Sequence, residues 1–280
     1  MANESTYTSM SALVNPIWET ALLTLSEQSI MPPLVRNFSD SGSSTPRQWA
    51  QYTGGTIQTI TEATDMAAQT FTPAAAGTLT PTQFGIAYFL TDQRIASDPF
   101  GARQDAGADL GRVIAVKVDT DLVGNFASFT GGTVGAGSGT ITWSNIQRAS
   151  AYLKAAYAPA PYTCVLHPTQ WYGLVSATSV PTLLQSQTLM DQYGRSFYQA
   201  SWAGIDFFVD ANITAGTAAK GGMFSRDAIA FDQRRALRIE PQRDASRGGG
   251  GFELNATILY AQGLYRPTWG CQIIGSTSIT

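Results

Sequence analysis

SDPFGARQDAGADLGRVIAVKVDTDLVGNF, residues 97–126, is the stretch that decides the fold. It opens with Ser97-Asp98-Pro99, in which an acidic capping residue precedes a proline at the first helical position. Apolar side chains then recur at every fourth position: Ala102, Ala106, Leu110, Ile114, Val118, Leu122 and Phe126. The pattern predicts a helix roughly 40 Å long. Because a helical turn holds about 3.6 residues, its buried face must wind along the helix.

The composition indicates a chain whose surface is largely covered by neighbours. Its 280 residues carry a net charge of −3, and 13% of them are charged, roughly half the share typical of soluble domains. Three lysines stand against fourteen arginines, and arginine tolerates desolvation at protein interfaces better than lysine. Compositional bias of a GC-rich genome is the alternative explanation. The slight acidity argues against a tight nucleic-acid binder.

Residues 52–80 have the pattern of a long two-stranded arm that projects from the body. Thr56–Thr61 alternates Thr and Gln with Ile, and Phe71–Thr80 is rich in Thr between Pro and Gly. The centre, Glu62–Gln69, holds little that a separate domain could bury. Isolated hairpins are marginally stable in water, so we expect the arm to lie on another chain. Residues 37–53, which are small and polar, indicate an extended lead-in.

Contacts between subunits are expected from this arm and from a basic cluster near residue 235. The predicted contact residues are Thr56, Gln58, Glu62, Asp65, Phe71, Arg234 and Arg235. The cluster also includes Arg238, Arg243 and Arg247. It could face nucleic-acid phosphate or the carboxylates of a neighbour, and the sequence leaves both open.

The remaining elements indicate an α+β fold. Gly131–Gly139 is predicted to be a flexible link, and helices are expected after Asn15, Thr142 and Pro168. The predicted strands are Tyr162–Leu166, Ile205–Val209, Met223–Phe224, Ala228–Phe231 and Ala236–Glu240. A closing antiparallel pair is expected to join Arg238–Arg243 to Phe252–Tyr265.

We find no residue set that predicts catalysis, a cofactor or a bound metal. Cys164 and His167 fall on opposite faces of a predicted strand, whereas a nucleophile and its base must lie within about 3 Å. His167 precedes Pro168 and fits the cap of the next helix. One His and two distant Cys do not supply the ligands of a zinc site.

Two carboxylate pairs and the cysteines have structural explanations. Asp119 with Asp121, and Asp206 with Asp210, are expected to be solvated or to cap nearby backbone. Cys164 and Cys271 are expected to be reduced thiols, or to form at most one bridge. The first residues lack the pattern of a signal peptide, and no apolar run approaches the ~20 residues that span a membrane.

The order of elements resembles the major capsid protein of tailed bacteriophages, with its HK97-like fold. Residues 89–126, FLTDQRIASDPFGARQDAGADLGRVIAVKVDTDLVGNF, are similar to the segment that leads into the family's spine helix. YTCVLHPTQWYGLV, residues 162–175, resembles the strand and aromatic helix of its axial domain. FELNATILYAQGLYRPTWGCQIIG, residues 252–275, resembles the strand that returns to the peripheral domain.

The resemblance implies a division of the chain and an assembly. Residues 1–51 would be an N-terminal arm, 52–80 the extended loop over the adjacent subunit, 81–139 with 236–280 the peripheral domain, and 140–235 the axial domain. Pentamers and hexamers would form an icosahedral virion shell around double-stranded DNA, bound non-specifically, assembled in the host bacterial cytoplasm. Portal, scaffolding and decoration proteins would be further partners, and no membrane would be involved.

Two departures from the family qualify this expectation. Some members join the extended loop to a neighbour through a Lys–Asn isopeptide bond, but residues 51–81 contain no lysine, so no such cross-link is expected. The arm is also short for a cleaved scaffolding segment, which predicts a separate scaffolding protein or none. The alternatives are an encapsulin-type compartment shell, a gene-transfer-agent capsid and, more remotely, a hydrolase or surface-binding module.

Overall fold

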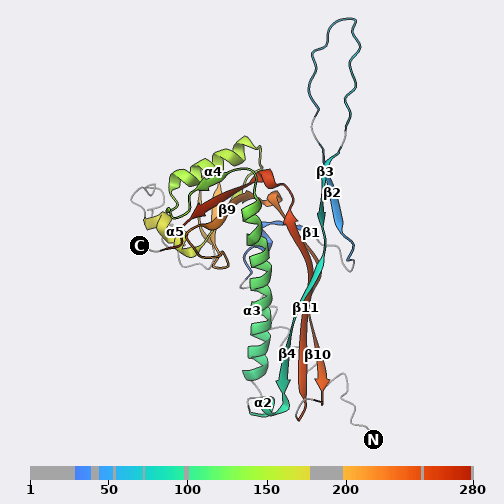
Figure 1. The fold of residues 1–280 in the computed structure, drawn as a ribbon, viewed down its shortest axis with the longest axis vertical. Helices are drawn as coiled ribbons and strands as arrows, with labels where there is room; N and C mark the ends of the chain where they lie inside the picture. Colours follow the sequence, from blue (N-terminus) through green and yellow to red (C-terminus); the bar gives the residue numbers. More distant parts are fainter. Residues whose placement is uncertain are drawn as a thin grey trace.

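The computed structural model describes residues 29–38, 44–52, 55–71, 73–97, 101–176, 198–246 and 249–278. Within these ranges a long helix stands beside a four-stranded sheet, and a second unit of sheet and helices lies to one side of its upper end (Figure 1). A loop projects beyond both units. This mixture of elements confirms the predicted α+β class.

The long helix is α3 (Gly101–Gly124), which confirms the helix predicted from the four-residue repeat. The repeat residues Leu110, Ile114, Val118 and Leu122 are buried. The 3-10 turn η2 (Asn125–Ser128) that follows buries Phe126 completely. Asp98 and Pro99, the predicted start, lie outside the described residues. The short helix α2 (Asp92–Ser97) precedes them.

The four-stranded sheet has the order β1 (Arg36–Phe38), β10 (Ile229–Asp244), β11 (Gly251–Leu264) and β4 (Thr82–Thr91). The antiparallel β10–β11 hairpin confirms the predicted closing pair. β10 is one strand where two pieces were predicted, because register shifts beside Arg235 interrupt its alternation without ending it.

Strand β4 was missed, although its sequence carries the signal. Phe84, Ile86, Tyr88 and Leu90 alternate with other residues and pack against the core of the α3 layer. Such a period of two is typical of a strand with one buried face. β4 pairs antiparallel with β11, and its end leads directly into α2.

The six-stranded sheet has the order β5-β12-β9-β6-β8-β7. Its strands are β5 (Thr133–Gly135), β12 (Gly270–Gly275), β9 (Ala219–Ser225), β6 (Tyr162–Leu166), β8 (Ile205–Val209) and β7 (Tyr198–Trp202). β6 and β8 confirm predicted strands. The helices α4 (Trp143–Ala155) and α5 (Pro168–Ser176) belong to this unit. α4 begins at the predicted cap, where the Thr142 side chain accepts a hydrogen bond from the Asn145 amide.

The C-terminal strand differs from the expectation. Residues 252–275 were expected to return together to one domain, but β11 lies in the four-stranded sheet whereas β12 pairs with β9 and β5 in the six-stranded sheet. The turn η5 (Pro267–Trp269) separates the two strands. The chain therefore crosses between the units once more than its sequence suggested.

The glycine run 131–139 is also not a simple link, because it contains the edge strand β5. A side chain at Gly131 would place its Cβ 2.3 Å from the carbonyl oxygen of Thr268. Gly135 has a φ of 82°, and a Cβ there would lie 2.0 Å from the carbonyl oxygen of Ile274. Glycine is required here for close backbone approach and a left-handed conformation, rather than for flexibility.

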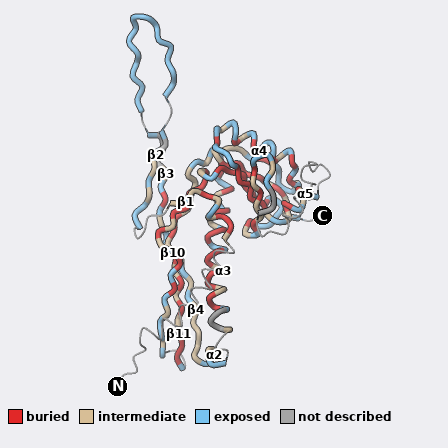
Figure 2. The backbone as a smooth tube through the Cα atoms, turned by 180° about the vertical axis from the view of Figure 1, so that it is seen from behind, coloured by how far each residue is buried: buried red, intermediate tan, exposed pale blue. Residues whose placement is uncertain are grey.

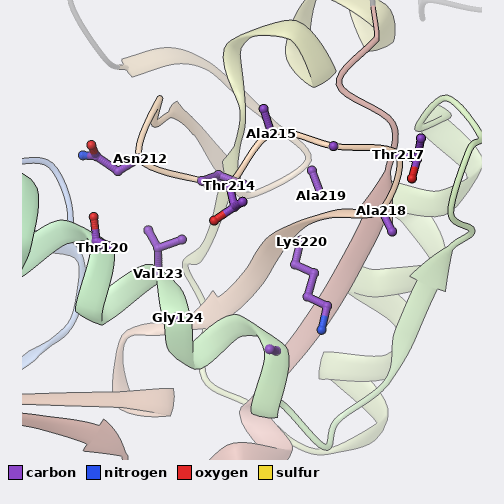
Figure 3. A pocket seen from close by; sticks show the side chains of 13 residues that line it. Thr120, Val123, Gly124, Asn212, Thr214, Ala215, Thr217, Ala218, Ala219 and Lys220 are labelled. Atoms are coloured by element: carbon purple, nitrogen blue, oxygen red, sulfur yellow. The ribbon is translucent and has the colours of Figure 1, made fainter.

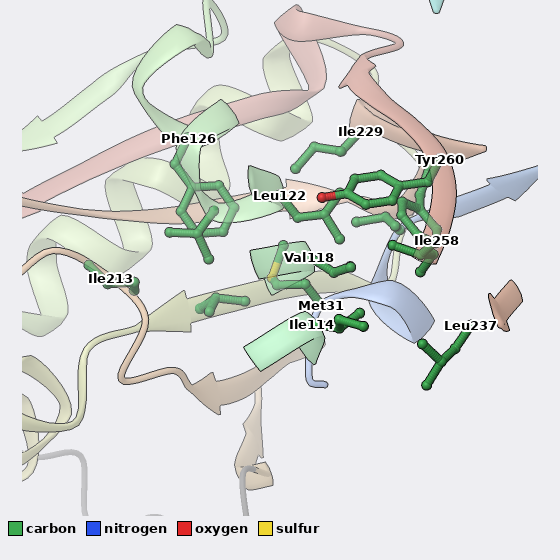
Figure 4. Packing of buried hydrophobic residues seen from close by; sticks show 14 of the residues in the cluster. Met31, Ile114, Val118, Leu122, Phe126, Ile213, Ile229, Leu237, Ile258 and Tyr260 are labelled. Carbon is green, nitrogen blue, oxygen red and sulfur yellow. The ribbon is translucent and has the colours of Figure 1, made fainter. Parts of the chain in front are cut away.

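Two hydrophobic cores hold these units. The first lies between α3 and the four-stranded sheet, where Val118 and Leu122 meet Ile258 and Tyr260 (Figure 4). The second fills the six-stranded unit and includes Ile146, Leu153 and Phe207. In Figure 2 buried residues run along α3 and through the six-stranded unit, whereas the loop above is exposed along its length.

Candidate functional site

The extended loop is held at its base by a short ladder, β2 (Arg47–Tyr52) against β3 (Pro73–Leu79). Leu79 is buried with Ala230 and Ala261 in a small core on the four-stranded sheet, and Trp49 packs against that core. A Cβ at Gly77 would lie 2.2 Å from the Trp49 ring, so the absence of a side chain there lets the indole lie flat on β3. The base thus packs on the body of its own chain.

A buried carboxylate adds a polar anchor to this base. Asp232 on β10 is fully buried, and its Oδ2 lies 2.9 Å from Arg47 Nε of β2 and 2.9 Å from Arg234 Nη2. Removing one member of such a buried cluster leaves an uncompensated charge, which is strongly destabilising. The ion cluster therefore fixes where the loop leaves the body.

The distal loop, residues 55–71, has no strand ladder, so the predicted strand Thr56–Thr61 is wrong. The two sides are joined by side chains instead: Gln69 Oε1 accepts from the Thr56 amide at 2.8 Å, and Gln58 Nε2 donates to the Ala67 carbonyl at 3.3 Å. At the tip the Thr64 amide donates to the Thr61 carbonyl. Alternation of Thr, Gln and Ile suggested a strand, but no partner backbone lies opposite it.

Apolar side chains along the distal loop are open to solvent. Ile57 is 98% exposed, and Ile60, Met66 and Phe71 are each more than 60% exposed. Phe71 stacks on Tyr52 with ring centroids 4.5 Å apart, which is a contact within the loop. Soluble proteins seldom expose contiguous apolar patches without a partner. These four exposed apolar side chains favour the prediction that the distal loop contacts a partner.

The structure brings five predicted contact residues together and separates the other two. Thr56, Gln58, Glu62, Asp65 and Phe71 all lie on the exposed distal loop. Arg234 is 7% exposed and belongs to the Asp232 cluster under the base. Arg235 is half-buried, and its Nε and Nη2 atoms have no hydrogen-bond partner in the described part of the chain. The contact roles themselves remain predictions.

Tyr157 is a surface residue that sequence reasoning missed. The Tyr157 amide donates to the Lys154 carbonyl and the Ala158 amide to the Leu153 carbonyl, which is the Schellman motif that closes a helix, here α4. Tyr157 occupies the position where glycine is usual, with a φ of 54° and 90% of its surface exposed. The left-handed conformation costs about 1 kcal/mol for such a residue.

A cleft of about 380 Å³ is lined in part by residues 159–161, which follow Tyr157 in the chain. Its lining residues are Arg36, Asn37, Pro159, Ala160, Pro161, Ser225, Arg226 and Asp227. Arg36 Nη1 lies 3.1 Å from Asp227 Oδ1, and the Arg36 side chain remains 39% exposed. Arg226 is exposed and uses Nε to donate to the Val35 carbonyl. The cleft presents two guanidinium groups and one carboxylate.

Asp119 was expected to be solvated or a local cap, but it is fully buried and caps a distant segment. Its Oδ2 accepts from the Ile30 amide at 2.8 Å, and its Oδ1 accepts from the Met31 amide at 3.2 Å. Burial raises its pKa to about 6, opposed by these amides, and the charge of Asp210 raises it further. The carboxylate thus holds the residues before β1 on α3.

Asp210 is also fully buried, and burial raises its pKa. Its Oδ1 accepts from the Asn212 amide at 2.8 Å, so it caps a turn after β8, as predicted. Its Oδ2 has no hydrogen-bond partner among the described residues. Asp121 differs from both, since it pairs with Lys117 one turn away and accepts from the Tyr260 hydroxyl.

The Cys164–His167 stretch is a strand-to-helix corner, as predicted. β6 ends at Leu166, and the Thr169 amide donates to His167 Nδ1 at the start of α5. Burial lowers the pKa of His167. Cys164 and Cys271 are both free and buried, and burial raises the pKa of the Cys271 thiol to about 12. Protonated, buried thiols are poor nucleophiles.

A second cleft, of about 510 Å³, lies between the end of α3 and residues 212–220 (Figure 3). Val123 and Gly124 form one side, and Lys220 is the only charged residue among those that line it. A catalytic site needs an acid, base or nucleophile within reach of a partner group, which this lining does not supply. In the described ranges no three His, Cys, Asp or Glu residues converge on a metal position.

Among the described residues, no helix combines the length and apolarity required to cross a bilayer.

The family comparison gives one match, and it covers most of the chain. Residues 74–271 match the sequence model of a family described as phage capsid protein. A comparison with curated proteins gives no match.

Several solved structures are similar to this chain in the arrangement of their elements. A structure from Mycobacterium phage Che8 has a TM-score of 0.69 at 18% identity, covering 88% of this chain and 90% of that one. A virus-like particle from Pyrococcus furiosus has a TM-score of 0.61 at 8% identity, covering 92% and 98%. The capsid of a native GTA particle has a TM-score of 0.61 at 13% identity, covering 90% of each chain.

Proposed function

The chain belongs to the phage capsid protein family and is a structural major capsid protein with an HK97-like fold, and from this premise we propose how it assembles. Copies associate as pentamers and hexamers, and these close into an icosahedral shell around double-stranded DNA. The chain is a component of the virion shell, and assembly takes place in the host bacterial cytoplasm. Its role is mechanical rather than enzymatic.

The observation that carries this proposal is the contrast between the loop and its own subunit. Ile57 is 98% exposed and the distal loop has no backbone ladder, so the few side-chain contacts within the loop offset little of the entropy cost of ordering residues 55–71. A second subunit beneath the loop would bury these side chains. Repetition of such contacts by symmetry makes a strong shell from individually weak interfaces.

The division of the subunit follows its two cores. We assign α3 and the four-stranded sheet to the peripheral domain and the six-stranded unit to the axial domain around the local symmetry axes. With β12 in the six-stranded sheet, the axial domain also includes residues 270–275. This differs from a boundary that places residues 236–280 wholly in the peripheral domain.

DNA is a non-specific content of the proposed shell rather than a ligand of one site. A net charge of −3 provides little general attraction to phosphate, so packaging would be driven by other components. A portal, a separate scaffolding protein and decoration proteins are the further partners that a shell of this kind would use.

Electron microscopy of the purified protein tests the proposal. We expect closed shells of uniform diameter, with five-fold and six-fold clusters on their surface. Replacing residues 55–71 with a Gly-Ser linker of equal length should give folded subunits without shells, because the β2–β3 base is retained. Dispersed monomers of the unaltered chain under all conditions, or normal shells from the linker variant, would contradict the proposal.

Two of the similar structures suggest other contents for the proposed shell. A virus-like particle and a GTA capsid share the arrangement of elements, so the same subunit architecture could enclose protein cargo or fragments of DNA. Nuclease-protected nucleic acid extracted from purified particles distinguishes these contents: long uniform DNA indicates a phage, short heterogeneous DNA a gene-transfer agent, and none a cargo compartment.

The loop also bears on covalent joining of subunits. Residues 51–81 contain no lysine, so they cannot supply the amine of a Lys–Asn bond. Particles boiled in SDS should therefore run as a single band of 29.9 kDa. A ladder of multiples that persists in reductant would contradict this prediction without affecting the capsid assignment.

A further inference from the structure

Tyr157 has a left-handed backbone held by the two hydrogen bonds that close α4, but its side chain has no partner in the described part of its own subunit. It occupies the left-handed position after α4 with a φ of 54°, where glycine would relieve the strain. Its ring is 90% exposed, and no described residue packs on it or accepts its hydroxyl. A non-glycine residue in this conformation is a reason to look for function, and an exposed aromatic side chain is a frequent anchor of interfaces.

The surface around Tyr157 defines what it could bind. Pro159 and Pro161, which follow Tyr157 closely in the chain, are exposed and line the cleft. Arg226 is exposed and Arg36 is partly exposed, and both line the same cleft, in which Asp227 is the only acidic lining residue. A partner must therefore present apolar side chains beside carboxylates. The net positive charge of the lining favours an acidic segment.

The distal loop has the matching chemistry. Residues 52–81 contain two charged side chains, Glu62 and Asp65, and both are acidic. Ile57, Ile60 and Met66, on either side of the tip, are exposed apolar groups. In Figure 1 the loop projects away from both sheets, so it does not fold back onto the cleft of its own chain. Only another copy can bring loop and cleft together.

We infer that Tyr157 and the Arg36–Arg226 cleft receive the tip of the extended loop from a second copy of this chain. The inference rests on the proposed shell, because it identifies the surface beneath the loop. Tyr157 and the prolines cover the apolar side chains, and the two arginines face Glu62 and Asp65. The exposed ring of Tyr157 is then covered in the assembly and not in the free subunit.

Disulfide trapping between copies tests this pairing. Chains with Thr64→Cys are mixed before assembly with chains carrying Tyr157→Cys, and the particles are oxidised. The native Cys164 and Cys271 are buried, so they do not compete. We expect a reducible dimer from this mixture and none from a mixture of Thr64→Cys with Tyr172→Cys, an exposed tyrosine on α5.

The outcomes separate this inference from the proposed function. Closed particles without the Thr64–Tyr157 dimer, or with equal cross-linking to position 172, overturn the inference and leave the shell intact. Absence of particles from the unaltered chain overturns the proposed function itself. A dimer specific to Tyr157→Cys supports both.

Substitution of Tyr157 by glycine gives a second test with opposite effects on subunit and assembly. Glycine relieves the left-handed strain, so the melting temperature of the unassembled subunit should rise by about 2 °C. Loss of the ring should raise the subunit concentration required for assembly by about tenfold. Tyr172→Ala should change the assembly concentration by less than about twofold. A Tyr157→Gly chain that assembles at the unaltered concentration overturns the inference.

Discussion

The base and the distal half of the extended loop are consecutive in the chain but differ in what holds them. The base is fixed by contacts with its own subunit, and the distal half is largely exposed. At the base, Leu79 is buried and Arg47 reaches the buried Asp232, so the subunit itself fixes the position. In the distal half, Ile57 is almost fully exposed and the two sides are joined mainly by glutamine side chains. The subunit determines where the loop begins, whereas by the proposed function a neighbouring copy determines where its distal half lies.

The largest effect is expected where the base is anchored. Asp232→Ala leaves the buried Arg234 guanidinium without its carboxylate, and the free energy of unfolding should fall by about 3–5 kcal/mol. Urea denaturation of the unassembled subunit measures this change. Arg238→Ala, which breaks the exposed Arg238–Glu240 pair, is the matched control and should change stability by less than about 1 kcal/mol. Equal losses in the two variants would show that the cluster does not anchor the base.

The free energy of unfolding should change by about 2–3 kcal/mol with pH. The group responsible lies in the body of the subunit and not in the loop. Burial raises the pKa of Asp119 from 3.8 to about 6, so the folded chain retains a proton that the unfolded chain releases. The associated stability is fully present below pH 3.8 and is lost as pH rises through about 6. The charged group facing Asp119 among the described residues is Asp210, whose raised pKa acts in the same direction.

Urea denaturation of the subunit between about pH 4 and pH 7.5 checks this sign. The unaltered chain should lose stability as pH rises across this range, and Asp119→Asn should flatten the profile. Ile57→Ser, on the distal loop, should leave the profile as it is. A profile in Asp119→Asn identical to that of the unaltered chain would assign the pH dependence to other groups.

A substitution in the distal loop should change the protein concentration needed for assembly but not the stability of the free subunit. Ile57→Ser removes an apolar side chain that is exposed in the subunit and, by the proposed function, covered in the shell. The loss of about 1.5 kcal/mol per contact corresponds to roughly a tenfold rise in the concentration needed for assembly. Light scattering measures assembly, and thermal unfolding of the free subunit should not change. A lower melting temperature would instead place Ile57 in the core of its own subunit.

The sequence predicted the elements whose stabilising contacts follow a local period. The repeat from Leu110 to Leu122 specified α3 because each of these residues faces the same core. The alternation of apolar residues in β4 is equally local, so this missed strand was predictable from the sequence. The failed strand at Thr56–Thr61 shows the limit of periodicity: alternation describes a surface, but a strand also requires a partner.

Contacts between distant residues had no signal in the sequence. Asp119 receives the Ile30 amide from 89 positions away, and Arg47 meets Asp232 across 185 positions. A carboxylate on a helix looks solvated until the fold brings an unpaired amide to it. The same reason explains Arg234, which composition suggested as a surface contact and which the Asp232 cluster buries. The glycine run 131–139 was predicted to be a flexible link for a related reason: β5 forms by pairing with β12, which is distant in the sequence.

The smallest effect is expected from the charges at the loop tip. Glu62→Gln with Asp65→Asn removes both carboxylates of residues 52–81 without touching a buried group. Partly exposed charge pairs contribute less than about 1 kcal/mol each and weaken with salt. Assembly of the unaltered chain should therefore require more protein as salt increases, while the double variant should require slightly more at low salt and respond less to salt. Because both substitutions keep the side-chain size, an identical salt response in the two chains would mean that the tip rests on an uncharged surface.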